Sequence, residues 1–200
     1  LTGQEFGGMK TRGLIESDFY GGGTENKPTA MMRHAWAEVS WPAWDFAVLG
    51  GQTADLNGPL DPPVLDPNVL RSGGNIGYRH PQVRLTKGFT LGEVRLDWAV
   101  AAVRNVPVSA TWFTGDAGSD AGYPMGVSRL GLSVPGWTKQ PVVAGLSGSL
   151  GQEEWDSSKA GSPRYVRSWT GVVDLNLPLM NALVLKGEGW MGEYVATFGA

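Results

Sequence analysis

The chain has 200 residues, of which 30 are glycine, 9 are tryptophan and none is cysteine, and its formal net charge is −3. Without cysteine it has no disulfide framework, no thiolate metal ligand and no thiol nucleophile. The weakly negative charge supplies no basic face for nucleic acid, so we expect no nucleic-acid partner. The longest purely apolar run, residues 98–103, is far shorter than the ~20 residues that a membrane-spanning helix needs.

Polar and apolar residues alternate, with the period of a β-strand, in about nine segments of the chain. The first segment, residues 9–20, places Lys10, Arg12, Glu16 and Asp18 on one face. Pro81 lies inside a later segment, and because proline cannot donate a ladder hydrogen bond we expect a β-bulge there. The polar faces of the later segments carry, in chain order, His34, Trp36, Glu38, Ser40, His80, Gln82, Arg84, Thr86, Arg95, Asp97, Arg129, Ser133, Ser147, Ser149, Asp174, Asn176, Lys186 and Glu188.

Short and long connections alternate between these predicted strands. In an antiparallel meander every second connection lies at the same end of the sheet, so one end is tight and the other carries long loops. This asymmetry is typical of a bacterial outer-membrane barrel. The short connections are residues 41–44, 87–89, 135–137 and 178–181, and the long polar ones are roughly residues 21–30, 54–75, 104–125 and 152–164.

Aromatic residues support the same interpretation. Trp41, Trp44 and Trp137 lie at or beside the short turns, where the periplasmic aromatic girdle of a barrel is found. Arg33 and Arg167 fall on the apolar faces, next to long loops. A lipid-facing arginine costs only ~0–1 kcal/mol near the membrane interface, so we expect both at the outer rim, beside lipopolysaccharide phosphates. Two ordinary surface arginines are the alternative.

These patterns predict an all-β chain that forms an antiparallel up-and-down transmembrane β-barrel in a bacterial outer membrane. We expect residues 1–200 to be one barrel domain, truncated at both ends. A soluble β-sandwich that binds carbohydrate is the first alternative, since its aromatic residues and polar sheet face would look similar. An outer-membrane barrel with an enzymatic or structural role is the second. We expect no enzyme, no catalytic residue, no metal and no cofactor, because the sequence lacks the known catalytic motifs.

Several motifs occur in an order that resembles the DcaP-like porins, which are trimeric outer-membrane channels of proteobacteria. They lie at residues 13–19, 33–38, 49–53 and 78–86, and the similarity is clear over residues 9–86. The resemblance implies a sixteen-stranded barrel, of which this chain would be a part, and a homotrimer. It also implies passage of small anionic solutes such as dicarboxylates.

The polar faces supply the candidate pore lining. Opposite charges across a water-filled channel select solutes by charge and size, and the planar guanidinium group suits carboxylates. We therefore expect a porin for small hydrophilic solutes with a preference for anions. In the alternative, the arginines and carboxylates only pair with one another along a wet wall. The candidates are Lys10, Arg12, Glu16, Asp18, Glu38, His80, Gln82, Arg84, Arg95, Asp97 and Arg129.

The connection at residues 54–75 is the candidate constriction. Its prolines stiffen the chain, and apolar residues such as Leu60 could anchor it inward against the barrel wall. Asp55, Asp61 and Asp66 are the candidate constriction residues. A surface loop without a functional role is the alternative.

Overall fold

A computed structural model describes residues 2–19, 29–60, 76–105, 121–155 and 164–193 of the chain. Within these ranges the chain forms nine β-strands and one short 3₁₀ helix, Pro42–Trp44. None of the described residues belongs to a helix long and apolar enough to cross a lipid bilayer. The strands are β1 (Lys10–Asp18), β2 (Met31–Trp41), β3 (Phe46–Ala54), β4 (Arg79–Leu91), β5 (Val94–Val103), β6 (Met125–Val134), β7 (Val142–Trp155), β8 (Arg164–Met180) and β9 (Leu183–Glu193).

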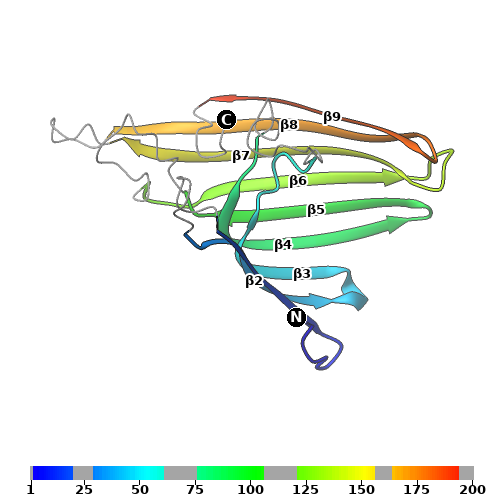
Figure 1. The fold of residues 1–200 in the computed structure, drawn as a ribbon, viewed down its shortest axis with the longest axis horizontal. Helices are drawn as coiled ribbons and strands as arrows, with labels where there is room; N and C mark the ends of the chain where they lie inside the picture. The colour runs from blue at the N-terminus through cyan, green and yellow to red at the C-terminus, as the bar shows by residue number, and fades with distance from the viewer. Residues whose placement is uncertain (1, 20–28, 61–75, 106–120, 156–163, 194–200) are drawn as a thin grey trace.

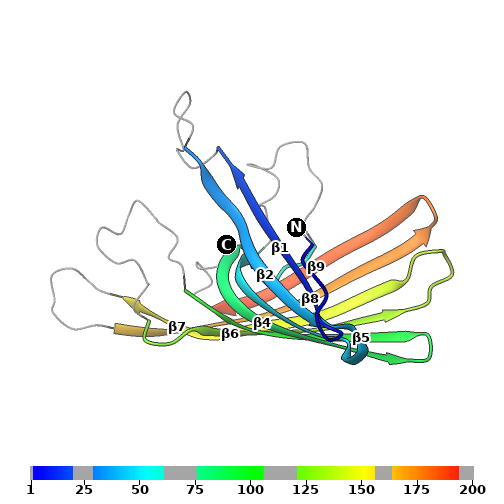
Figure 2. The same cartoon turned by 90° about the horizontal axis from the view of Figure 1, so that it is seen from below.

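The strands form one sheet in which each strand pairs only with its neighbours in sequence. The order is β1 to β9 without a crossover, and all eight pairings are antiparallel (Figure 1). The sheet curls, so that β1 and β2 stand up steeply from the floor formed by β4 to β7 (Figure 2). The all-β, up-and-down prediction is therefore confirmed. The alternation of connections is confirmed in part: tight turns follow β2, β4 and β8, and long loops follow β1, β3 and β5. The connection after β6, residues 135–141, is longer than the predicted turn at 135–137 and is nearly as long as the connection after β7, residues 156–163.

Two of the predicted turns are misplaced. The turn predicted at residues 87–89 is wrong, because β4 continues through Gly88 to Leu91 and turns at Gly92 and Glu93 instead. Gly92 has φ +63°, a left-handed conformation that favours glycine. The predicted turn at 178–181 also lies too early, since β8 runs to Met180 with a register shift between Pro178 and Met180.

The β-bulge predicted at Pro81 is absent. Pro81 pairs in register with Gln52 on β3, and the register continues unbroken from Lys87 to Arg79. In an antiparallel ladder the N and O atoms of one residue point to the same neighbouring strand. The Pro81 oxygen accepts a hydrogen bond from Arg104 N, so its nitrogen also points toward β5. The β4–β5 pairing begins one residue later, at Gln82, and therefore needs no donor from proline.

The register defines two faces of the sheet. One row of laterally paired residues crosses all nine strands and marks what we call the inner face: Arg12, Glu38, Leu49, Arg84, Ala101, Val127, Ser149, Thr170 and Gly192. The opposite, outer face carries large apolar side chains that the sheet leaves exposed: Ile15, Val83, Leu85, Trp98, Leu130, Leu132, Leu146, Leu150, Val173, Leu175, Leu185 and Met191. Such an apolar outer band with a polar inner face is the pattern of a membrane barrel wall.

The predicted position of Arg33 on the outer face is wrong. The β1–β2 register shifts after Glu16, which pairs with His34, while the next residue, Ser17, pairs with Met32. Arg33 is thus the extra residue of a β-bulge. Its guanidinium group binds the inner-face carboxylates of Glu16 at 3.0 Å and Asp18 at 2.8 Å. Bulges re-aim side chains in this way. Arg167, by contrast, is exposed and lies on the outer face with Trp169 and Val173.

Candidate functional site: a segment that crosses the inner face

Residues 55–60 leave the end of β3 and pass over the inner face of the sheet. We call them the crossing segment. Leu56 is buried together with Ile76, from the returning part of the same loop, and with Ala101, Met125 and Val127 on the floor of the sheet. Burying these apolar side chains removes them from water. The main apolar cluster of the described residues therefore lies on the otherwise polar inner face and holds the segment there.

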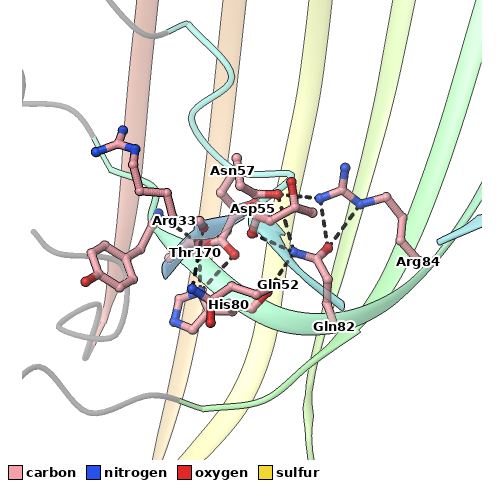
Figure 3. Close-up of polar contacts among 11 residues, drawn as sticks. Arg33, Gln52, Asp55, Asn57, His80, Gln82, Arg84 and Thr170 are labelled. Carbon is pink, nitrogen blue, oxygen red and sulfur yellow. Dashed lines mark hydrogen bonds and ion pairs between the residues drawn. The ribbon is translucent and has the colours of Figure 1, made fainter. Parts of the chain in front are cut away.

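Asp55 fixes the base of the crossing segment (Figure 3). Its backbone N–H donates to the Tyr78 oxygen at 2.9 Å, and its carboxylate accepts the Tyr78 N–H at 2.9 Å. The same carboxylate contacts His80 Nδ1 at 2.8 Å, and both side chains are completely buried. Asp55 thus ties the departing and returning ends of the loop together, and a buried carboxylate of this kind needs all of these partners.

Asn57 and Leu60 fix the far end of the segment. Asn57 is 1% exposed, and its Nδ2 donates to Thr170 Oγ1 on β8 at 2.9 Å. Thr170 Oγ1 lies 2.7 Å from Ser149 Oγ on β7, which continues the hydrogen-bonded chain. The Leu60 N–H donates to Glu188 Oε2 on β9 at 3.3 Å. The crossing segment therefore spans the sheet from β3 to β9.

Most of the predicted pore-lining cations are paired with carboxylates. Arg12 makes a two-pronged contact with Glu38, at 2.6 and 3.0 Å, and Arg129 makes one with Asp174. Arg95 binds both Asp45 and Asp97, and Lys10 binds Glu5. Bidentate pairing with a carboxylate is the strongest geometry available to arginine. These residues meet on the inner face as predicted, but largely as neutralised pairs.

Arg84 is held differently, by neutral oxygen atoms. Its Nε and Nη2 donate to Gln82 Oε1 at 3.0 and 2.8 Å, and Nη2 also donates to the Ala54 oxygen. Among the described residues, no carboxylate lies within ion-pair distance of Arg84. Of the nearby carboxylates, Glu38 is bound by Arg12, and Asp55 by His80 and Tyr78. Arg84 sits near the middle of β4, beside the base of the crossing segment (Figure 3).

The predicted site residues therefore fall into three groups. Gln82 and His80 lie on the expected face but are buried beside the crossing segment, at 5% and 0% exposure, as is Asp55. Asp61 and Asp66 lie outside the described residues. The others are on the inner face, half-buried or exposed: Lys10, Arg12, Glu16, Asp18, Glu38, Arg84, Arg95, Asp97 and Arg129.

Several residues that matter in this site were missed from the sequence. Asn57, Thr170 and Asp174 supply the anchor and an ion-pair partner, and Asp45 supplies another. Asp174 and Thr170 follow the period-2 pattern of β8, which marks their face but not their contacts. Asn57 and Asp45 lie in connections, where the pattern gives no face at all. Only the three-dimensional register brings these side chains to the residues that they bind.

The chain has the fold of the wall of an outer-membrane channel. It is similar to the crystal structure of the outer membrane channel DcaP of Acinetobacter baumannii, with a TM-score of 0.70 at 19% sequence identity. The match covers 94% of this chain and 49% of DcaP, so this chain spans about half the length of that channel. The resemblance inferred from the sequence motifs is thereby confirmed at the level of the fold. No protein-family model matches the sequence, and a search of curated proteins finds no match.

Proposed function

We propose that this chain forms part of the wall of an outer-membrane porin, a passive channel for small hydrophilic solutes. The observation that carries the proposal is the difference in polarity between the two faces of the sheet. The outer face is an exposed apolar band on strand after strand, and the inner face carries paired charges and a segment bound across it. A lipid bilayer suits the first face and a water-filled passage the second. The fold shared with DcaP, a channel, supports the same proposal.

The crossing segment supports a narrowed passage. A segment fastened at Asp55 and again at Asn57 occupies space on the inner face, so solutes must pass beside it. The Asp55–His80 pair holds the segment in place and does not contact solutes, since neither side chain is exposed. We propose the connection at residues 54–75 as the constriction, with residues 55–60 as its fixed part.

The proposal extends to a preference for anions. Arg84 supports it, because its charge is not neutralised by an adjacent carboxylate among the described residues. The paired arginines Arg12, Arg95 and Arg129 contribute fixed dipoles more than net charge. The solutes proposed are therefore small anions such as dicarboxylates. Assembly as a homotrimer, and contact of the exposed Arg167 with lipopolysaccharide, are part of the same proposal.

A planar-bilayer recording tests the proposal. The natural full-length protein, purified in detergent, should give discrete conductance steps, and under a salt gradient the reversal potential should show that anions pass more readily than cations. Discrete steps without anion preference would retain the porin and remove the anion proposal. Absence of conductance from protein that is folded in detergent would contradict the porin itself.

A further inference from the structure

We propose that Gln82 is a positioning residue for ion selectivity: it fixes the Arg84 guanidinium group on the inner face without pairing it with a carboxylate. The inference rests on the proposed channel function and deepens it. Gln82 is 5% exposed, so it acts through Arg84 and need not meet the solute itself.

The orientation of the Gln82 amide is determined by its surroundings. Its Nε2 faces three backbone oxygens, those of Thr53 at 3.0 Å, Ala54 at 3.3 Å and His80 at 3.3 Å. Its Oε1 faces two guanidinium N–H donors of Arg84. Turning the amide over would place oxygen against carbonyl oxygens and N–H against N–H. The side chain therefore presents its oxygen, and only its oxygen, to Arg84.

The hydrogen bonds of Gln82 and Arg84 connect β4, the end of β3 and the base of the crossing segment. Gln82 and Arg84 lie on the same face of β4, two residues apart, and the Thr53 and Ala54 oxygens belong to the end of β3, directly before the crossing segment. Arg84 itself donates to the Ala54 oxygen. The guanidinium group is thus held at the base of the segment, where the passage is proposed to be narrow (Figure 3).

The choice of a neutral acceptor has an electrostatic consequence. Arg12, Arg33, Arg95 and Arg129 are each held by a carboxylate, which cancels most of their charge at a distance. An amide oxygen holds a guanidinium group less strongly than a carboxylate does, but it orients the group by hydrogen bonds and adds no charge. In a narrow passage, a guanidinium group that is not paired with a carboxylate attracts anions and repels cations. Glutamine at position 82 thereby makes Arg84 different from these four arginines.

The decisive variant is Gln82→Glu, which keeps the size of the side chain and adds one negative charge. In planar bilayers we expect the reversal potential of this variant to move to that of Arg84→Gln, while single-channel conductance changes little. The matched control is Gln52→Glu, because Gln52 lies on the neighbouring strand in the outer row and donates to the Met32 and Arg33 oxygens, away from Arg84. The control should keep the reversal potential of the wild type.

A second variant covers the case in which Gln82→Glu does not fold, since its carboxylate would face three backbone oxygens. Gln82→Met removes both sets of hydrogen bonds at similar volume. We expect it to lose part of the anion preference in the wild-type background and to change nothing in an Arg84→Gln background. A non-additive result of this kind identifies an effect transmitted through Arg84.

The outcomes separate the inference from the proposed function. If wild-type protein conducts with anion preference and both Gln82 variants retain it in full, the role of Gln82 is refuted and the porin stands. The same holds if Gln82→Met shifts the reversal potential equally with and without Arg84. If the wild type itself shows no conductance, the proposed function fails, and with it the inference that rests on it.

Discussion

Arg129 on β6 and Asp174 on β8 form a two-pronged ion pair that passes over the strand between them. Arg129 Nη2 donates to Asp174 Oδ1 at 2.9 Å, and Nη1 donates to Oδ2. The residue below the pair is Gly145 on β7, which lies beside Asp174 in the register. A Cβ atom at Gly145 would overlap both the guanidinium group and the carboxylate. The ion pair therefore leaves no room for a side chain at position 145, and only glycine fits there.

We predict that Gly145→Ala breaks this pair. Asp174 is 2% exposed in its side chain, so displacing its partner leaves a carboxylate poorly compensated. We expect a loss of about 1–3 kcal/mol in the free energy of unfolding, as for other overpacked sites. Urea unfolding of detergent-solubilised protein measures it. Gly171→Ala on β8 is the matched control, because a Cβ there meets nothing within 4 Å. Equal stability of the two variants would contradict the prediction.

The same arrangement recurs at the tight end of the sheet. Arg95 on β5 reaches over Gly88 on β4 to Asp45, with contacts of 2.8 and 3.2 Å, and a Cβ at Gly88 would overlap that pair. Asp45 lies in the turn before β3. Hydrogen bonds from Arg95 hold the pKa of Asp45 below its ordinary value.

The lowered pKa of Asp45 predicts a pH-dependent contribution to stability. The contribution is complete above the pKa in the unfolded chain, about 3.9, and is lost as the pH falls through the lower folded-state value. Asp45→Asn should cost at most about 1 kcal/mol at neutral pH, since the pair is nearly half exposed and screened by solvent. Urea unfolding at neutral pH and at about pH 3 compares the two proteins. A penalty that is the same at both pH values would show that ionisation of Asp45 is not its cause.

Release of the far end of the crossing segment should widen the proposed passage. Asn57→Ala and Thr170→Val each remove the hydrogen bond between Asn57 and Thr170. We expect a higher single-channel conductance and faster entry of larger sugars in liposome swelling. The two changes together should have little more effect than either alone, because they remove the same bond.

Ser133→Ala is the control for the widening experiment. Ser133 is an inner-face residue of β6, and it lies far from the crossing segment along the strand. This variant should leave conductance and swelling rates unchanged. Wild-type conductance in Asn57→Ala, with the protein folded, would mean that the segment does not narrow the passage.

The outer apolar face predicts a depth-dependent cost for charge. Leu85, at the middle of β4, and Leu91, at its end, lie on the same face of the same strand. Leu85→Arg should cost about 2–4 kcal/mol in folding into lipid bilayers, and Leu91→Arg only about 0–1 kcal/mol. Urea titrations of protein folded in liposomes measure both. Equal, small costs at the two positions would instead favour the soluble β-sandwich, with this face in water.

The sequence predicts the wall of this protein much better than its interior. Period-2 alternation depends only on neighbouring residues, so it identified the strands and the face of Arg84 or Glu38. It placed a turn at Gly88 because glycine usually marks one, whereas Gly88 leaves space for the ion pair between Arg95 on β5 and Asp45 in the turn before β3. It placed Arg33 outward because unbroken period-2 alternation does not include the β-bulge at that residue. The crossing segment depends on contacts between distant parts of the chain, which no local pattern contains.

Those distant contacts also impose an order on assembly. Every strand pairing in the wall joins sequence neighbours, so the sheet can grow one hairpin at a time with little loop entropy to overcome. The bond between Asn57 and Thr170 instead joins residues 113 positions apart, and contacts of such separation form late. The acceptor, Thr170 Oγ1, reaches its position only after β8 has paired with β7. A newly assembled wall should therefore pass through a stage in which the crossing segment is not yet bound to Thr170, and the proposed channel should become selective only at the last step.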